Sequence, residues 1–170
     1  PNASLYAAYL ALRAAGEEYG MKLFGARAVE SMRMEKGFLH WKADILTEFD
    51  PFETGLDRFV NLNKSDFVGK AALQSRRADG PTRKFVTLDI DCTHAPARGG
   101  ASLMHDGRVV GTITSGDWGY RVGRNLAYAF VEPDLAVIGG EFTIDLLGDL
   151  IAATVIEPGP YDPGFEKIRS

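Results

Sequence analysis

The sequence has little of several features that would place it in familiar protein classes. Its 170 residues include one cysteine, Cys92, which excludes an internal disulfide and favours a reducing, cytoplasmic location. No apolar run approaches the about 20 residues that a membrane-spanning helix needs, so no membrane partner is expected. The formal net charge of −4 leaves no basic excess for binding nucleic acid.

Motifs of several enzyme classes are also missing. There is no G-x-S-x-G nucleophile elbow and no P-loop, and the glycines of GYRVGRN precede a predicted strand, whereas a dinucleotide fingerprint opens a helix. The three histidines stand apart from other ligands at metal-binding spacing, so no metal is expected. Cys92 and His94 lie on a segment that we interpret as extended, with neighbouring side chains pointing apart, which disfavours a nucleophile pair.

The start of the chain lacks two further features. It does not begin with Met, and it lacks the charged-then-apolar layout of a secretory signal. We therefore expect a fragment or a processed chain.

The first part of the sequence has helical patterns. With 45% hydrophobic and 25% charged residues, a folded core is expected. Apolar spacing predicts an amphipathic packing helix over residues 3–19 and a second helix over 25–36, which Gly37 ends. A short helix over 67–75 and a short strand over 60–62 are also expected.

The second part changes to a period-two pattern. In FVTLDI (85–90), Val86, Leu88 and Ile90 share one face. Hairpins are predicted over 101–115, with a turn at His105–Gly107, and over 141–156, with a turn at Gly148–Asp149. The Gly-rich segment 115–125 is predicted as a loop and 126–132 as a strand. Short strands separated by turn signals indicate a small barrel or a sandwich, so the chain is expected to be α+β.

We expect three units along the chain. Residues 1–76 form the mainly helical part, 77–84 form a linker that is rich in charge, Gly and Pro, and 85–170 form the β domain.

The stretch from Gly25 to Leu73 combines charges, aromatics and glycines closely. Two interpretations stay open at this point. One is an ordinary helix face on which Glu30 pairs with Arg27 or Arg33. The other is a pocket for a flat, polar-edged heterocycle with an anionic tail, walled by aromatics and bound by a carboxylate and an arginine. The second interpretation would use Arg27, Arg33, Glu35, Phe38 and Trp41.

Several segments in this order resemble the glycine-cleavage T-protein (aminomethyltransferase) family. They are GARAVESMRMEKGFLHWKADI, PFETGLDRFV and KSDFVGKAAL in the first half, and RKFVTLDID, DGRVVGTITSGDWGYRVGRNLAYAFVEPD and PYDP in the second. The likeness is closer to the branch fused to dimethylglycine and sarcosine dehydrogenases. It implies the C-terminal portion of a folate-binding domain followed by a small antiparallel β-barrel.

The resemblance also implies a function. Family members transfer a one-carbon unit from glycine-derived or N-methylated amines to tetrahydrofolate, and the fused branch would carry FAD in an upstream domain that is not present here. An aspartate that assists the chemistry belongs to a missing N-terminal half. The expected partners are therefore folate, a small amine and that N-terminal half. The parent protein would be an enzyme, this chain alone would be inactive, and no catalytic residue is assigned in it.

Particular residues take family positions. In this resemblance Arg33 and Glu35 occupy the Arg and Glu of an Arg-Leu-Glu signature. Phe38 falls where members often carry an aromatic beside the pterin, and Trp41 falls at a second aromatic position. Where glycine-cleavage members read Ala-Arg-Asp-Ser-Leu-Arg, Val29 replaces the first Arg. This departure favours N-methylated amines over glycine cleavage.

Two alternatives remain. The chain could belong to a non-enzymatic folate-binding regulatory or repair protein of the same fold. Alternatively, it binds nothing alone and only packs against the missing half, in which case exposed apolar surface would cause self-association.

Overall fold

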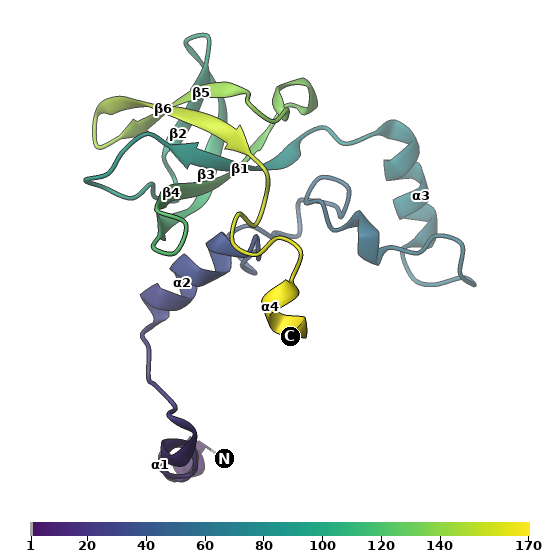
Figure 1. The fold of residues 1–170 in the computed structure, drawn as a ribbon. Coiled ribbons are helices and arrows are strands. Elements are labelled where there is room, and N and C mark those ends of the chain that lie inside the picture. Colours follow the sequence, from purple (N-terminus) through teal and green to yellow (C-terminus); the bar gives the residue numbers. More distant parts are fainter. Residues whose placement is uncertain (1) are drawn as a thin grey trace.

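The dominant unit of the computed structural model is a closed antiparallel barrel (Figure 1). The structure describes residues 2–170, except for the side chain of Ile168. In spatial order the barrel reads β1-β4-β3-β2-β5-β6, and β1 pairs with both β4 and β6, which closes it. This confirms the barrel rather than the sandwich. The strands are β1 (Lys84–Ile90), β2 (Ser102–His105), β3 (Arg108–Gly119), β4 (Arg124–Val131), β5 (Glu141–Leu146) and β6 (Asp149–Ile156).

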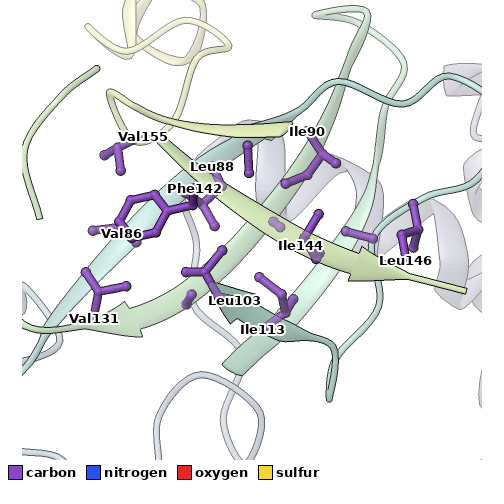
Figure 2. Packing of buried hydrophobic residues seen from close by; sticks show 14 of the residues in the cluster. Val86, Leu88, Ile90, Leu103, Ile113, Val131, Phe142, Ile144, Leu146 and Val155 are labelled. Carbon is purple, nitrogen blue, oxygen red and sulfur yellow. The ribbon is translucent and has the colours of Figure 1, made fainter. Parts of the chain in front are cut away.

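Inward-facing apolar side chains fill the barrel, as the alternation predicts. Val86, Leu88 and Ile90 of β1 are at most 5% exposed. They pack against apolar residues of the other strands inside the barrel (Figure 2), among them Leu103, Ile113, Val131, Phe142, Ile144, Leu146 and Val155. Burying each large aliphatic side chain contributes about 1.5–3 kcal/mol, so the barrel has a core of its own.

Two of the turns follow from turn chemistry. Asp106 and Gly107 have φ angles of 49° and 73°, the left-handed pair that a two-residue hairpin favours, and this confirms the predicted turn. The other hairpin turns at Leu147 and Gly148, because Leu146 pairs with Asp149. The prediction of Gly148–Asp149 was therefore one residue late.

The Gly-rich segment is not the predicted loop. β3 continues to Gly119 and β4 begins at Arg124, so only a short turn separates the two strands. The glycines allow close approach: a Cβ on Gly116 would lie 2.5 Å from the carbonyl oxygen of Ala97. The prediction was wrong because it assigned these glycines to a loop, whereas they make room within a strand.

The helices differ in how they relate to the barrel. They are α1 (Leu5–Gly16), α2 (Ala26–Glu35), α3 (Lys70–Asp79) and α4 (Glu166–Arg169), with 3-10 turns at Asn2–Ser4, Glu17–Tyr19, Asp57–Phe59 and Pro133–Leu135. α2 packs on β3 and β4, whereas α1 lies away from the barrel beyond an extended segment (Figure 1). The two predicted N-terminal helices are confirmed, but α1 has no buried residue, so its expected packing role is not realised within the described chain.

The segment before the barrel needs two corrections. Residues 60–62 form no strand. The predicted helix over 67–75 instead begins after Gly69, whose φ of 91° is left-handed, and runs to Asp79. It extends into the predicted linker because the helix-ending residues, Gly80 with its positive φ of 79° and Pro81, come only after Asp79. The division into three units stays a prediction.

Candidate functional site

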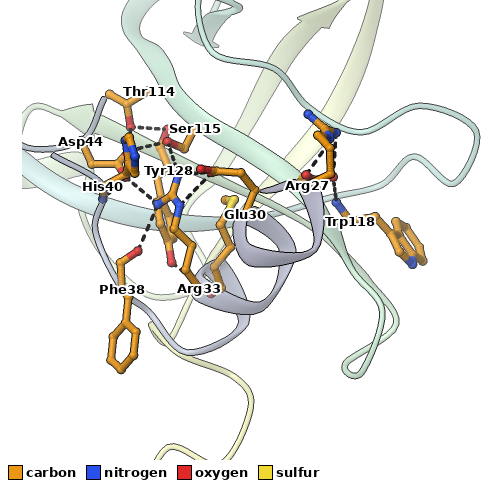
Figure 3. A network of polar contacts seen from close by, with 12 residues as sticks. Arg27, Glu30, Arg33, Phe38, His40, Asp44, Thr114, Ser115, Trp118 and Tyr128 are labelled. Atoms are coloured by element: carbon orange, nitrogen blue, oxygen red, sulfur yellow. Dashed lines mark hydrogen bonds and ion pairs between the residues drawn. The ribbon is translucent and has the colours of Figure 1, made fainter. Parts of the chain in front are cut away.

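α2 is attached to the barrel by a buried polar network around Arg33 and Asp44 (Figure 3). Arg33 Nη1 lies 2.8 Å from Asp44 Oδ2, and the Asp44 residue is fully buried. The other Asp44 oxygen accepts from the hydroxyls of Thr114 and Ser115 on β3, at 2.6 and 2.7 Å. A buried ion pair of this kind needs such extra hydrogen bonds to offset the loss of hydration.

The remaining donors of Arg33 are also engaged. Nε donates to Glu30 Oε2 at 2.8 Å, Nη1 to the Phe38 carbonyl at 3.0 Å, and Nη2 to Ser115 Oγ at 2.8 Å, with Glu30 Oε2 2.6 Å from Nη2. A guanidinium has five N–H donors, and here each has a protein acceptor within reach. Burial alone lowers the pKa of Arg33, but Glu30 and Asp44 outweigh it and raise the pKa above its usual value.

A small apolar cluster lies beneath this network. Met34 of α2 is buried against Leu126 and Tyr128, which face outward from β4. The Tyr128 hydroxyl donates to the Met34 carbonyl at 3.0 Å, and burial raises the pKa of this phenol well above its usual value. Sequence reasoning missed Asp44 and Tyr128. Asp44 meets the strand residue Thr114, 70 positions away, and Tyr128 meets Met34, 94 positions away.

Glu35, at the end of α2, holds the turn between β3 and β4. The residue is 2% exposed, and its Oε1 accepts the backbone N–H groups of Arg121 and Val122 at 2.5 and 3.2 Å. Two backbone donors on one carboxylate oxygen are a strong, charge-assisted arrangement. Glu35 therefore joins a helix to a turn that is distant in sequence.

The other three predicted residues lie nearer the surface. The Arg27 side chain is 61% exposed and contacts Asp117 at 3.1 Å. Phe38 is 49% exposed and stacks on Phe165 with ring centroids 6.2 Å apart. Trp41 is exposed and bridges to Ile45 through the backbone.

Two pockets adjoin these residues. The first, which we call the apolar pocket, measures about 490 Å³ and lies between residues 37–59 and strands β1 and β6. Its walls include Phe38, Phe59, Phe85 and Ile138, with Arg58 beside them. The second, which we call the polar pocket, measures about 330 Å³ and lies between α2 and the β3–β4 turn. It brings Arg27 and Glu35 together, whereas Phe38 lines only the apolar pocket and Trp41 lines neither of the two.

The Cys92–His94 pair differs from its prediction. The Cys92 sulfur lies 3.4 Å from His94 Nδ1, so the predicted separation was wrong. Adjacent residues of an extended segment point apart, but residues two positions apart face the same side, and the chain also bends after β1. The bend is fixed by Asn125, whose side chain donates to the carbonyls of Cys92 and Ala95. Among the described residues no cluster of three metal-ligating side chains occurs, and no described helix has the length and hydropathy of a membrane span.

The architecture defines the class of protein: a closed six-stranded barrel that carries α2 and the segment after it on its outside. Residues 83–162 match the model of the glycine cleavage T-protein C-terminal barrel domain, and residues 1–64 match that of the GCVT N-terminal domain. The chain belongs to the glycine cleavage T-protein family. This confirms the resemblance found in the sequence.

Named relatives agree with this assignment. The chain is 36% identical over 152 residues to the mitochondrial dimethylglycine dehydrogenase of Rattus norvegicus, covering 89% of this chain and 18% of the relative. It is 32% identical over 177 residues to the mitochondrial sarcosine dehydrogenase of Mus musculus, covering 99% and 19%. For the aminomethyltransferase of Synechococcus sp. (strain WH7803) the identity is 35% over 138 residues, covering 81% and 37%.

A solved structure shows the same fold. The glycine cleavage system aminomethyltransferase T from Bartonella henselae superposes with a TM-score of 0.75 at 29% identity, covering 80% of this chain and 38% of that one. The chain thus spans between 18% and 38% of the length of these relatives.

Proposed function

We propose that this chain acts within a protein that transfers a one-carbon unit from an N-methylated amine, such as dimethylglycine or sarcosine, to tetrahydrofolate. The observation that carries the proposal is the match of both family domains, in order, along the chain. The choice of N-methylated amines is supported by the similarity to dimethylglycine and sarcosine dehydrogenases over 89% and 99% of the chain. Val29, at the position of an arginine in glycine-cleavage members, points the same way.

The apolar pocket fits one part of a folate. Tetrahydrofolate combines a ring system with an anionic tail, and Phe38 and Phe59 offer apolar surface to a ring while Arg58 offers a cation beside them. Phe59 is 72% exposed and Phe38 49%, so these walls leave much of a ring uncovered. In this proposal the remaining walls come from the rest of the protein, as the length of the relatives implies.

Arg33 and Glu35 have indirect roles in this proposal. Their contacts engage Asp44, Ser115 and the β3–β4 turn, so they fix α2 and, with it, the aromatic segment that follows Gly37. Their predicted contact with folate, like that of Arg27 and Trp41, stays a prediction. FAD in an upstream domain also stays a prediction.

The chemistry divides between cofactor and protein. When bound, tetrahydrofolate supplies the nitrogen that accepts the one-carbon unit. The residues of this chain orient the ring through the aromatic walls and exclude water from one side of it, and positioning of this kind accounts for a large part of the rate in such transfers.

Calorimetric titration of tetrahydrofolate tests the proposal. We expect saturable binding by this chain joined to the upstream half of its parent, and weak or no binding by this chain alone, because enclosure is incomplete. Phe38→Ala should weaken binding about tenfold, the equivalent of about 1.4 kcal/mol, whereas Phe24→Ala, at an exposed aromatic outside the pocket, should not. If neither substitution weakens tetrahydrofolate binding, or if both do, the assignment of the apolar pocket to folate is contradicted. Binding without one-carbon transfer would favour the non-enzymatic alternative.

A further inference from the structure

The polar pocket is separate from the apolar pocket that would hold the folate ring. It is lined by one face of α2 and by the end of β3 with its turn, and its residues are Arg27, Ala28, Ser31, Met32, Glu35, Asp117, Tyr120 and Arg121. At about 330 Å³ it is at the small end of the range for ligand sites. Its size therefore favours a molecule of a few heavy atoms.

Two buried carboxylates lie in this pocket with acceptor capacity left. Glu35 uses Oε1 for the turn, and its Oε2 has no donor within the described part of the chain. Asp117 is 6% exposed, and its Oδ2 is buried without a hydrogen bond from any described residue, although Arg27 Nη2 lies 3.1 Å away as an ion-pair partner. Buried acceptors normally have donors, so Asp117 Oδ2 favours a ligand that donates hydrogen bonds, and Glu35 Oε2 is a further acceptor in the same pocket.

Two arginines provide the opposite chemistry. Arg27 uses one nitrogen, Nη2, on Asp117, and Arg121 uses one, Nη1, on the hydroxyl of Tyr161 at 2.6 Å. Each guanidinium has further N–H donors that contact no acceptor in the described chain. The two arginines and two carboxylates give formal charges that sum to zero, so the pocket attracts neither a plain cation nor a plain anion as strongly as a molecule with both charges.

We propose that the polar pocket binds a small zwitterion, an amino acid whose ammonium group donates to Glu35 and Asp117 and whose carboxylate accepts from Arg27 and Arg121. The choice of an N-methylated glycine within this class rests on the proposed function. The zwitterionic class itself rests on the pocket.

Titrations of the 170-residue chain, followed by amide chemical shifts without folate, test this inference. We expect saturable shifts at the β3–β4 turn with sarcosine and dimethylglycine, and at least tenfold weaker binding of dimethylamine and of acetate, which each carry one charge. Equal binding of acetate, or no saturable shift with either amino acid, would overturn the proposal.

Two variants and a control sharpen the test. Arg27→Gln changes an exposed side chain and should weaken binding at least tenfold. Glu35→Gln keeps an oxygen for the turn N–H groups and should have a similar effect. Arg124→Gln removes an arginine that pairs with Asp89 instead, and should leave binding unchanged. If neither pocket variant weakens binding, the proposal is wrong.

A parallel tetrahydrofolate titration of the chain joined to its upstream half separates the two proposals. Binding of folate without binding of the zwitterions would overturn only the polar-pocket inference. Binding of the zwitterions without folate would overturn only the folate proposal.

Discussion

The barrel and the helical segments before it differ in how far their side chains are buried. In the barrel, strands from residues 84 to 156 bury their alternate side chains against one another. In α1 no residue is buried, and Leu5, Tyr6 and Leu12 are each about 70% exposed, at 71%, 70% and 69%. α3 likewise has no buried residue. The barrel therefore has its own source of stability, whereas α1 presents apolar surface that is suited to a further partner.

α2 stands between these extremes. It buries little apolar area, with Met34 as its one fully buried apolar side chain among the described residues. Its attachment depends instead on polar contacts from Arg33 and Glu35 to the barrel. Polar networks specify position more than they add stability, so this helix fixes where the following aromatic segment lies.

The largest expected effect separates the barrel core from α1. Leu88→Ala removes a fully buried side chain and should lower the free energy of unfolding by about 3–5 kcal/mol, through lost burial and a cavity. Leu12→Ala, in exposed α1, should change it by less than about 0.5 kcal/mol. Urea denaturation followed by circular dichroism measures both. Similar losses in the two variants would contradict the comparison.

The next effect concerns the attachment of α2. Asp44→Ala leaves the guanidinium of Arg33 buried without its carboxylate, which should cost about 3 kcal/mol. Because the barrel core is untouched, we expect the loss to appear as faster amide exchange in α2 and residues 38–45. Asp66→Ala, at an exposed position, is the matched control. An unchanged exchange rate in α2 would show that the network does not hold the helix.

We expect the exposed apolar face of α1 to cause self-association of the chain. Leu5→Glu with Leu12→Glu places charge on that face and should shift the chain toward monomer by several-fold at a given concentration, because apolar contact between copies is lost. Sedimentation velocity measures the change. A double substitution on the barrel surface, Val109→Glu with Leu150→Glu, is the control at residues of 63% and 65% exposure. An equal shift from the control would place the association on the barrel instead.

The smallest effect is a pH dependence on the barrel exterior. Burial raises the pKa of Asp89, and Asp91 adds to this while Arg124 opposes it. A raised pKa means that folding disfavours the charged form, so the native state binds more protons and stability falls as the pH rises through this range above 3.8. Asp89→Asn should therefore stabilise the barrel at pH 7 by less than about 0.5 kcal/mol, a figure reduced for solvent screening.

The gain should vanish once the pH falls below the usual aspartate range. Thermal unfolding at pH 7 and pH 3 tests this. A gain that is larger at pH 3 than at pH 7 would contradict the assigned direction.

The sequence predicts the barrel well because its signals are local. The alternation in Phe85–Ile90 and the turn at Asp106–Gly107 depend on neighbouring residues, and so does the pair of Glu30 with Arg33, confirmed at 2.6 Å. The segment 115–125 could not be read correctly, because Gly116 is required by the carbonyl of Ala97 and not by a turn.

The candidate site was harder to predict for the same reason. Glu30 was expected to pair with Arg27 or Arg33; it pairs with Arg33, and Arg27 contacts Asp117, which is 90 positions away. The predicted ligand contact of Glu35 stays a prediction, and the bonds from its Oε1 to the turn at Arg121 and Val122 were not foreseen. The helix face and its charges were visible in the sequence, but their partners come from strands whose positions only the folded barrel defines.

Hydrogen exchange measured by mass spectrometry on the 170-residue chain tests the central claim most directly. If the barrel supplies its own stability and α1 and α3 do not, amides of β1, β3 and β4 should exchange slowest, those of α2 at intermediate rates, and those of α1 and α3 close to unprotected rates. Protection of α1 and α3 equal to that of β4, at concentrations where the chain is monomeric, would contradict the claim.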